Sequence, residues 1–98
     1  ITYMSIAIFK LEEGGYQVSS ELGIKDYLFN LYLKRSKLYN KLNIDILECQ
    51  DLNEALENIS KYINLGDDEL DDLGIYKSED YIQNKFDEIK KLISENCD

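Results

Sequence analysis

The chain has 98 residues, of which 44% are hydrophobic, and a formal net charge of −9. This length suits one domain, and the hydrophobic fraction can build a single core, which argues against intrinsic disorder. Histidine is absent, so the commonest general base and the commonest transition-metal ligand are missing. No apolar stretch is long enough to span a membrane and the first residues do not resemble a secretion signal, so we expect a cytoplasmic protein.

The negative charge lies in the second half of the chain. Residues 1–50 contain six acidic and six basic residues, whereas residues 51–98 contain fourteen acidic and five basic residues. Such a surface repels nucleic acids and anionic lipids, and it suits a basic protein partner. The alternative is an acidic surface that only keeps a small protein soluble.

The chain opens with residues 3–11, YMSIAIFKL, which are rich in β-branched and aromatic side chains. Apolar residues fall on both faces, as in a strand that is covered on two sides. Gly14 and Gly15 can adopt the positive φ angles of a tight turn, and residues 16–22 alternate apolar and polar side chains. These patterns predict an N-terminal β-hairpin.

Residues 24–42 are compatible with two structures. Ile24, Leu28, Leu31 and Leu38 fall at helical spacing, whereas residues 27–33 also alternate as a strand would. Neither glycine nor proline interrupts the stretch and its basic residues lie late, which favours the helix over the strand. The apolar run that follows, LNIDILEC at residues 42–49, is predicted to be a short strand.

Two more helices are predicted. The first covers residues 52–64, with Asp51 as its N-cap and Gly66 as its C-terminal stop. The second runs from about Glu79 to Asn96, with Ser78 as its N-cap. Its predicted buried face consists of Ile82, Phe86, Ile89 and Leu92 or Ile93. Residues 1–98 are therefore expected to form one α+β domain, in which a small antiparallel sheet containing the hairpin packs against three or so helices.

The stretch GDDELDDLG, residues 66–74, has five acidic residues in nine positions. An EF-hand calcium loop needs glycine at its sixth position and glutamate at its twelfth, and no register of this stretch provides both. A short helical turn fits better, with Asp67 as its cap, Leu70 and Leu73 buried, and Gly74 at its end. This turn does not explain why Asp71 and Asp72 crowd like charges together, and that crowding indicates a contact with a basic partner.

Tyrosines lie close to this acid run, and tyrosine suits both half-buried packing and protein interfaces. We therefore predict a partner-binding site that consists of Asp67, Asp68, Glu69, Asp71, Asp72, Tyr76 and Tyr81. Ordinary packing of the tyrosines is the alternative.

A small basic group, Lys34, Arg35, Lys37 and Lys41, is flanked by tyrosines, which is one pattern of nucleic-acid binding. Four bases beside an acidic half make a poor phosphate footprint, so we expect a solvated helix face or an internal contact with residues 67–72 instead. No nucleic-acid or membrane partner is expected. The pair Cys49 and Cys97 lacks zinc-ligand spacing, and we expect two free thiols, with a disulfide between them as the alternative. No catalytic, cofactor or metal motif is present in the sequence.

Two segments together resemble the HicB-type antitoxins. IFKLEEGGYQV, residues 8–18, is similar to the first hairpin of that family, and DLNEALENISKYI, residues 51–63, is similar to its helix. These segments cover about a quarter of the chain. The resemblance implies a catalytically inert α+β protein that binds and blocks a toxic RNase. It carries no individual site residue over to this chain.

The sequence therefore predicts a small acidic inhibitor without enzymatic activity, which binds and neutralises a basic toxic protein such as a nuclease. Immunity proteins and antitoxins are the classes that fit. One alternative is a phage- or plasmid-encoded inhibitor of a host DNA-binding or defence enzyme, whose acids mimic phosphates. Another is a structural subunit without an inhibitory role. The oligomeric state is left open by the sequence.

Overall fold

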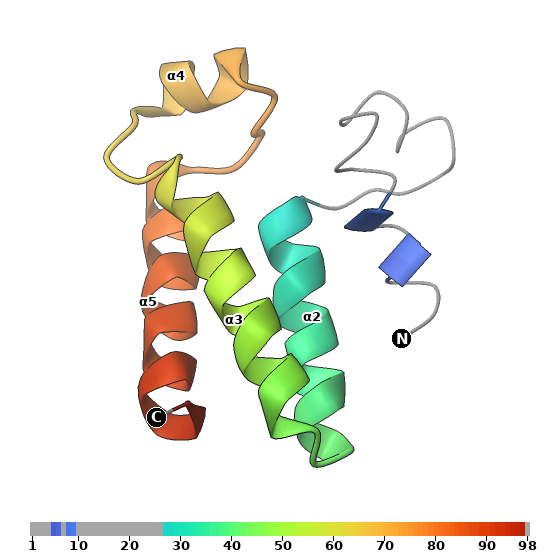
Figure 1. Ribbon diagram of the computed structural model, residues 1–98. Helices are drawn as coiled ribbons and strands as arrows, with labels where there is room; N and C mark the ends of the chain where they lie inside the picture. Colours follow the sequence, from blue (N-terminus) through green and yellow to red (C-terminus); the bar gives the residue numbers. More distant parts are fainter. Residues whose placement is uncertain (1–4, 7, 10–26, 98) are drawn as a thin grey trace.

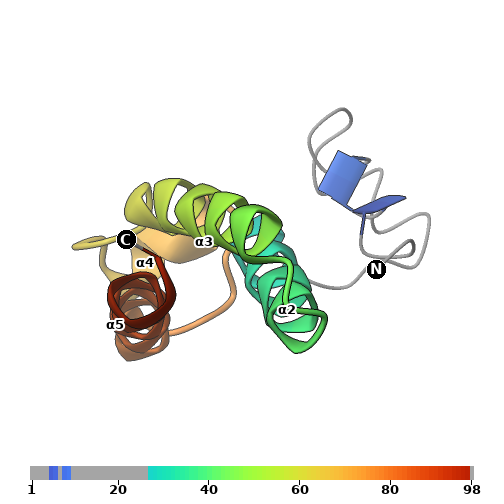
Figure 2. The same cartoon turned by 60° about the horizontal axis from the view of Figure 1, so that its bottom comes forward.

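A computed structural model of the chain describes residues 5, 6, 8, 9 and 27–97 (Figure 1). The ordered elements are α2 (Leu28–Lys41), α3 (Asp45–Ser60), α4 (Asp67–Asp72) and α5 (Glu79–Asn96). The three long helices run side by side with alternating directions, and the short α4 crosses one end of them (Figures 1 and 2). Over the residues listed above, the fold is entirely helical.

The predicted α+β class is therefore wrong, because no strand occurs in the described part of the chain. Residues 5, 6, 8 and 9 are helical where a strand over residues 3–11 was predicted. The predicted turn at Gly14 and Gly15 and the predicted strand at residues 16–22 lie outside the described residues. The helix within residues 24–42 was the correct choice, since α2 covers most of that range.

The predicted strand at residues 42–49 is also wrong, because α3 begins at Asp45. Asp45 and Glu48 lie in the first turn of α3, where their negative charges favour the positive end of the helix dipole. Ile44 and Ile46 are 37% and 75% exposed, so the alternating apolar pattern marks no buried strand face. Asp51 consequently lies inside α3 and is not its N-cap.

Helix α3 is the centre of the bundle, because α2 packs against one side of it and α5 against another (Figure 2). Its residues Leu52, Ala55 and Ile59 are almost completely shielded from solvent. The core around them is formed by the remaining buried apolar side chains: Ile8, Phe29, Leu31, Tyr32, Leu33, Leu70, Ile75, Ile82 and Ile89. Burial of these side chains is the main favourable contribution to folding.

Helix α5 has the predicted bounds and the predicted cap. The hydroxyl of Ser78 accepts a hydrogen bond of 3.1 Å from the backbone N–H of Tyr81. Ile82 and Ile89 are the fully buried members of its predicted inner face. The amphipathic spacing and the capping residue were thus sufficient to place this helix.

Helix α4 confirms that the acid run is a short helical turn, with two differences from the prediction. Its N-cap is Gly66 rather than Asp67, and Leu73 is 58% exposed whereas Leu70 is fully buried. Gly74 follows with a φ angle of 82°, a left-handed conformation that glycine adopts without steric cost. Leu73 is the C-cap residue of α4, where the backbone leaves the helix, and Leu70 alone enters the core.

A disulfide joins Cys49 in α3 to Cys97 just after α5, across 48 positions of sequence. The expectation of two free thiols is therefore wrong, since the described chain contains no free cysteine. The disulfide closes the end of the bundle opposite α4 (Figure 1). None of the helices in the described residues is long and apolar enough to cross a membrane.

Candidate functional site

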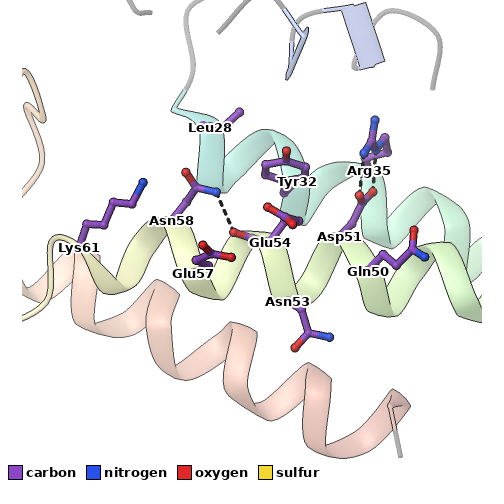
Figure 3. Close-up of a pocket in the computed structure, with 10 residues that line it drawn as sticks. All are labelled: Leu28, Tyr32, Arg35, Gln50, Asp51, Asn53, Glu54, Glu57, Asn58 and Lys61. Atoms are coloured by element: carbon purple, nitrogen blue, oxygen red, sulfur yellow. Dashed lines mark hydrogen bonds and ion pairs between the residues drawn. The ribbon is translucent and has the colours of Figure 1, made fainter. Parts of the chain in front are cut away.

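An open groove between α2 and α3 has a volume of about 830 Å³ (Figure 3). Most of its lining side chains are polar or charged: Arg35, Gln50, Asp51, Asn53, Glu54, Glu57, Asn58 and Lys61, together with Leu28 and Tyr32. Two of them bond within their own helix: the side-chain amide of Asn53 donates to the backbone carbonyl of Cys49, and that of Asn58 donates to the backbone carbonyl of Glu54. Besides carboxylates and amides, the lining includes the exposed ammonium of Lys61 and the phenol of Tyr32.

An ion pair between Arg35 and Asp51 crosses this groove (Figure 3). The guanidinium donates from Nε to Oδ2 at 2.6 Å and from Nη2 to Oδ1 at 2.7 Å. The hydrogen bond to Asp51 raises the pKa of Arg35 above its ordinary value, so this side chain stays charged at every physiological pH. The ion pair joins two helices and leaves neither charge available to a ligand.

The predicted basic group is therefore divided among contacts within the bundle. Besides the Arg35–Asp51 pair, the Lys37 ammonium donates to a carboxylate oxygen of Glu88 on α5 at 3.1 Å. These two bases pair with Asp51 and Glu88, and not with residues 67–72 as one alternative proposed. The group does not present four unpaired bases to a phosphate backbone.

The predicted partner-binding acids lie on α4, and two of them stabilise local structure. A carboxylate oxygen of Asp67 accepts a hydrogen bond of 2.8 Å from the backbone N–H of Glu79, at the start of α5. A carboxylate oxygen of Glu69 accepts a weaker bond of 3.4 Å from the backbone N–H of Gly66. The other three, Asp68, Asp71 and Asp72, are exposed to solvent.

The two predicted tyrosines differ in their surroundings. Tyr76 is 69% exposed, and its backbone N–H donates to the phenolic oxygen of Tyr27 at 2.9 Å. The phenol of Tyr81 accepts a hydrogen bond of 2.9 Å from the side-chain amide of Asn30, and the ammonium of Lys77 lies 5.0 Å from its ring centre. Tyr76 is therefore open to a partner, whereas Tyr81 contacts its own chain.

The bond from Glu79 to Asp67 brings the start of α5 against α4, and two more exposed acids, Glu79 and Asp80, join the same surface. We call this surface the acid end and define it as Asp68, Asp71, Asp72, Leu73, Tyr76, Glu79 and Asp80. Residues 67–80 contain seven acidic residues and one basic residue, so they carry most of the net charge. Sequence reasoning missed Leu73, Glu79 and Asp80 as members of this surface, although Glu79 and Asp80 lie only six and seven residues after Leu73, which was a usable signal.

A second exposed apolar group lies at the opposite end of the bundle, in the turn between α2 and α3 and the first turn of α3. It consists of Leu42, Ile44, Ile46 and Leu47. No comparable concentration of charge surrounds it in the sequence. The described residues contain no group of three or more acidic or cysteine side chains that could hold a metal ion.

No protein-family model matches the chain, and comparisons with curated proteins and with solved structures also find no match. The resemblance to HicB-type antitoxins consequently stays a prediction. The function has to be argued from the surfaces of the chain itself, and the acid end is the surface with the most distinctive chemistry.

Proposed function

We propose that this protein is a small acidic inhibitor without enzymatic activity, which uses its acid end to bind and neutralise a basic toxic protein. One observation carries the proposal: two exposed apolar side chains, Leu73 and Tyr76, lie between exposed acids along residues 67–80. Protein interfaces commonly combine an apolar or aromatic centre with a polar rim. A rim of one charge sign selects a partner of the opposite sign.

The acids and the apolar pair have separate roles in this proposal. Asp68, Asp71 and Asp72 attract a basic partner over several ångströms and raise the association rate, an effect that salt weakens. Leu73 and Tyr76 lose solvent contact in the complex and slow its dissociation. This division predicts that charge substitutions change the salt dependence of binding more than they change the fold.

A nuclease is the partner class that we propose, because an enzyme that binds a phosphate backbone needs a basic surface. The acid end would cover that surface and exclude the nucleic acid. A cytoplasmic location belongs to the same proposal, since a toxic nuclease acts where nucleic acid is present. Cytoplasmic thiols are usually kept reduced, so the fold must then hold with Cys49 and Cys97 as thiols, or the disulfide must resist reduction.

The test is affinity capture from a lysate of the organism that encodes the chain, with stepwise elution by salt. The wild type is compared with Asp71→Asn/Asp72→Asn and with a matched control, Glu54→Gln/Glu57→Gln, which removes two exposed charges from α3. We expect a basic protein that the wild type and the control retain and the Asp71/Asp72 variant loses. The purified partner should degrade nucleic acid and should lose that activity when an equimolar amount of the wild type is added.

If the wild type and both variants retain the partner equally, the acid end is not the surface that binds it. A captured protein without nuclease activity would contradict the partner class while leaving the surface in place. Circular dichroism of each variant confirms that the helices are intact before binding is compared.

A further inference from the structure

A pocket of about 250 Å³ opens beside the acid end. Three segments that are distant in sequence form it: the start of α2, the last turn of α3 with the residues after it, and the loop after α4. Its lining consists of Tyr27, Leu28, Phe29, Asn58, Lys61, Tyr62, Leu73, Gly74 and Ile75. It is smaller and less polar than the groove of Figure 3.

The inner walls of this pocket are aromatic and held in place. The rings of Tyr27 and Phe29 stack with 5.6 Å between their centres, and the ring of Tyr62 lies 6.2 Å from that of Phe29. The phenolic oxygen of Tyr27 also accepts the backbone N–H of Tyr76, which fastens the loop after α4 to α2. These contacts show a pocket that is formed before a ligand arrives, so binding needs little ordering of the walls.

The mouth of the pocket is continuous with the acid end. Leu73 belongs to both, and its side chain is 58% exposed. At Gly74, an added Cβ atom would meet nothing within 4 Å, so the space beside this residue is open. Asp71 and Asp72 directly precede Leu73 and are exposed. A protein partner that inserts a side chain into the pocket would therefore also lie close to these acids.

We propose that this pocket receives one uncharged aromatic side chain from the basic partner, an inference that rests on the proposed function. The size fits, because an apolar cavity of roughly 150 Å³ can bind a benzene molecule. The nearby charges determine which partner side chains fit. Lys61 in the lining repels a lysine or arginine that would enter the pocket. Asp71 and Asp72 attract a lysine or arginine just outside it. The partner segment is therefore an aromatic residue flanked by lysine or arginine.

The chain contains no tryptophan, so the fluorescence of a tryptophan probe reports the probe alone. The probe is a pentapeptide with a central tryptophan between two pairs of lysines. Calorimetry compares its affinity with that of the same peptide carrying alanine at the centre and with that of neutral N-acetyltryptophanamide, and fluorescence repeats the measurement for the two tryptophan probes. We expect the tryptophan peptide to bind the wild type about tenfold more tightly than the alanine peptide.

Three variants locate the effect. Leu73→Ala removes part of the rim and Asn58→Phe fills the pocket, and each should abolish the tenfold preference for tryptophan. Leu42→Ala is the matched control, because Leu42 is 57% exposed and lies in the turn at the other end of the bundle. It should leave the preference unchanged. Circular dichroism and urea unfolding confirm that each variant is folded.

The outcomes separate the pocket from the acid end. If the Asp71→Asn/Asp72→Asn variant weakens both peptides while tryptophan and alanine bind the wild type equally, the pocket assignment is overturned and the acidic surface stands. If neutral N-acetyltryptophanamide binds as tightly as the lysine-flanked peptide, the pocket is a small-molecule site and both the basic partner and this inference fail. A dimer in sedimentation that Leu73→Ala disrupts would assign the pocket to a second copy of the chain and overturn the inference.

Discussion

Asp51 holds the guanidinium of Arg35 where the two side chains are only 5% and 17% exposed. The planar guanidinium matches both carboxylate oxygens, and the rings of Tyr32 and Tyr39 lie 5.6 and 5.8 Å from its central carbon. A third hydrogen bond of 3.0 Å goes to the hydroxyl of Ser5. The pair therefore links α2, α3 and the N-terminal segment through one side chain.

Asp51→Asn should lower the free energy of unfolding by about 2–4 kcal/mol, because it leaves the Arg35 charge shielded from water without its counter-ion. Urea unfolding followed by circular dichroism measures the change. Glu57→Gln removes an exposed carboxylate from the same helix and serves as the control, with an expected change below about 0.5 kcal/mol. If the two variants are equally stable, the ion pair does not support the fold as we describe.

Glu88 provides a pH-dependent prediction. Its partial burial raises its pKa, but the hydrogen bond from Lys37 and the charges of Lys37 and Lys85 outweigh this, and the net pKa is lowered. A lowered pKa stabilises the fold above the unfolded-state pKa of about 4.3, and this contribution is lost as the pH falls through the folded-state pKa. The contribution is below about 1 kcal/mol, since the Glu88 side chain is 36% exposed.

Lys37→Met should raise the pKa of Glu88, because it removes the hydrogen bond that lowers it. An NMR titration of the Glu88 carboxyl carbon measures this directly. Lys41→Met removes a charge from the end of the same helix and should leave the titration unchanged. A Glu88 pKa that does not move in Lys37→Met would show that the pair is absent in solution.

At the scale of elements, a helix was predicted correctly where the sequence contains a capping residue at its start and one apolar face along its length. Ser78 and the spacing of Ile82 and Ile89 placed α5 correctly, because a cap and one apolar face fix a long helix. The start of α3 was missed, because Leu42, Ile44 and Ile46 alternate with polar residues like a strand, although they are 57%, 37% and 75% exposed. An apolar pattern predicts burial only when a neighbouring element covers it, and the sequence does not show which residues are covered.

The acid end could be predicted from the sequence, whereas the pocket could not. Asp68, Asp71, Asp72 and Tyr76 are close in sequence, so charge density alone could place them together. The pocket walls, in contrast, come from residues 27–29, 58–62 and 73–75. These segments meet through packing of α2 against α3, through the ring contact of Phe29 with Tyr62 and through the bond between Tyr76 and Tyr27. No local pattern could have indicated that meeting.

Ser78→Ala should lower the free energy of unfolding by about 1 kcal/mol, because the Tyr81 backbone N–H loses its acceptor. Ser94→Ala is the control, since Ser94 lies exposed inside the same helix and alanine has the higher helix propensity. Thermal and urea unfolding of both variants provide the comparison. Equal stabilities would mean that the helix start does not depend on this cap.

For the whole molecule, the disulfide and the acid end lie at opposite ends of the bundle (Figure 1). Cys49 and Cys97 enclose most of α3, all of α4 and all of α5 in one covalent loop. A loop of this length restricts the unfolded chain and so favours the folded state. The acid end lies within that loop in the sequence.

Cys49→Ser/Cys97→Ser should lower the free energy of unfolding by about 2–4 kcal/mol. The thermal midpoint of the wild type should fall when a reductant is added, whereas that of the double variant should not respond. Differential scanning calorimetry with and without reductant makes both comparisons. A wild type that is insensitive to reductant would indicate that the thiols are unpaired in solution, which is the state that a reducing cytoplasm favours.

The placement of α4 concentrates negative charge at one end of the helical bundle that the structure describes. Seven acids and one base lie within residues 67–80, and α5, with 18 residues, separates them from the opposite end by about 27 Å. This distance exceeds the Debye length of about 8 Å, so charges at the far end do not offset the field. Near a positively charged surface, the molecule should orient so that α4 faces that surface. On an anion-exchange resin, Asp71→Asn/Asp72→Asn should therefore elute earlier than Glu54→Gln/Glu57→Gln, although both variants have the same net charge.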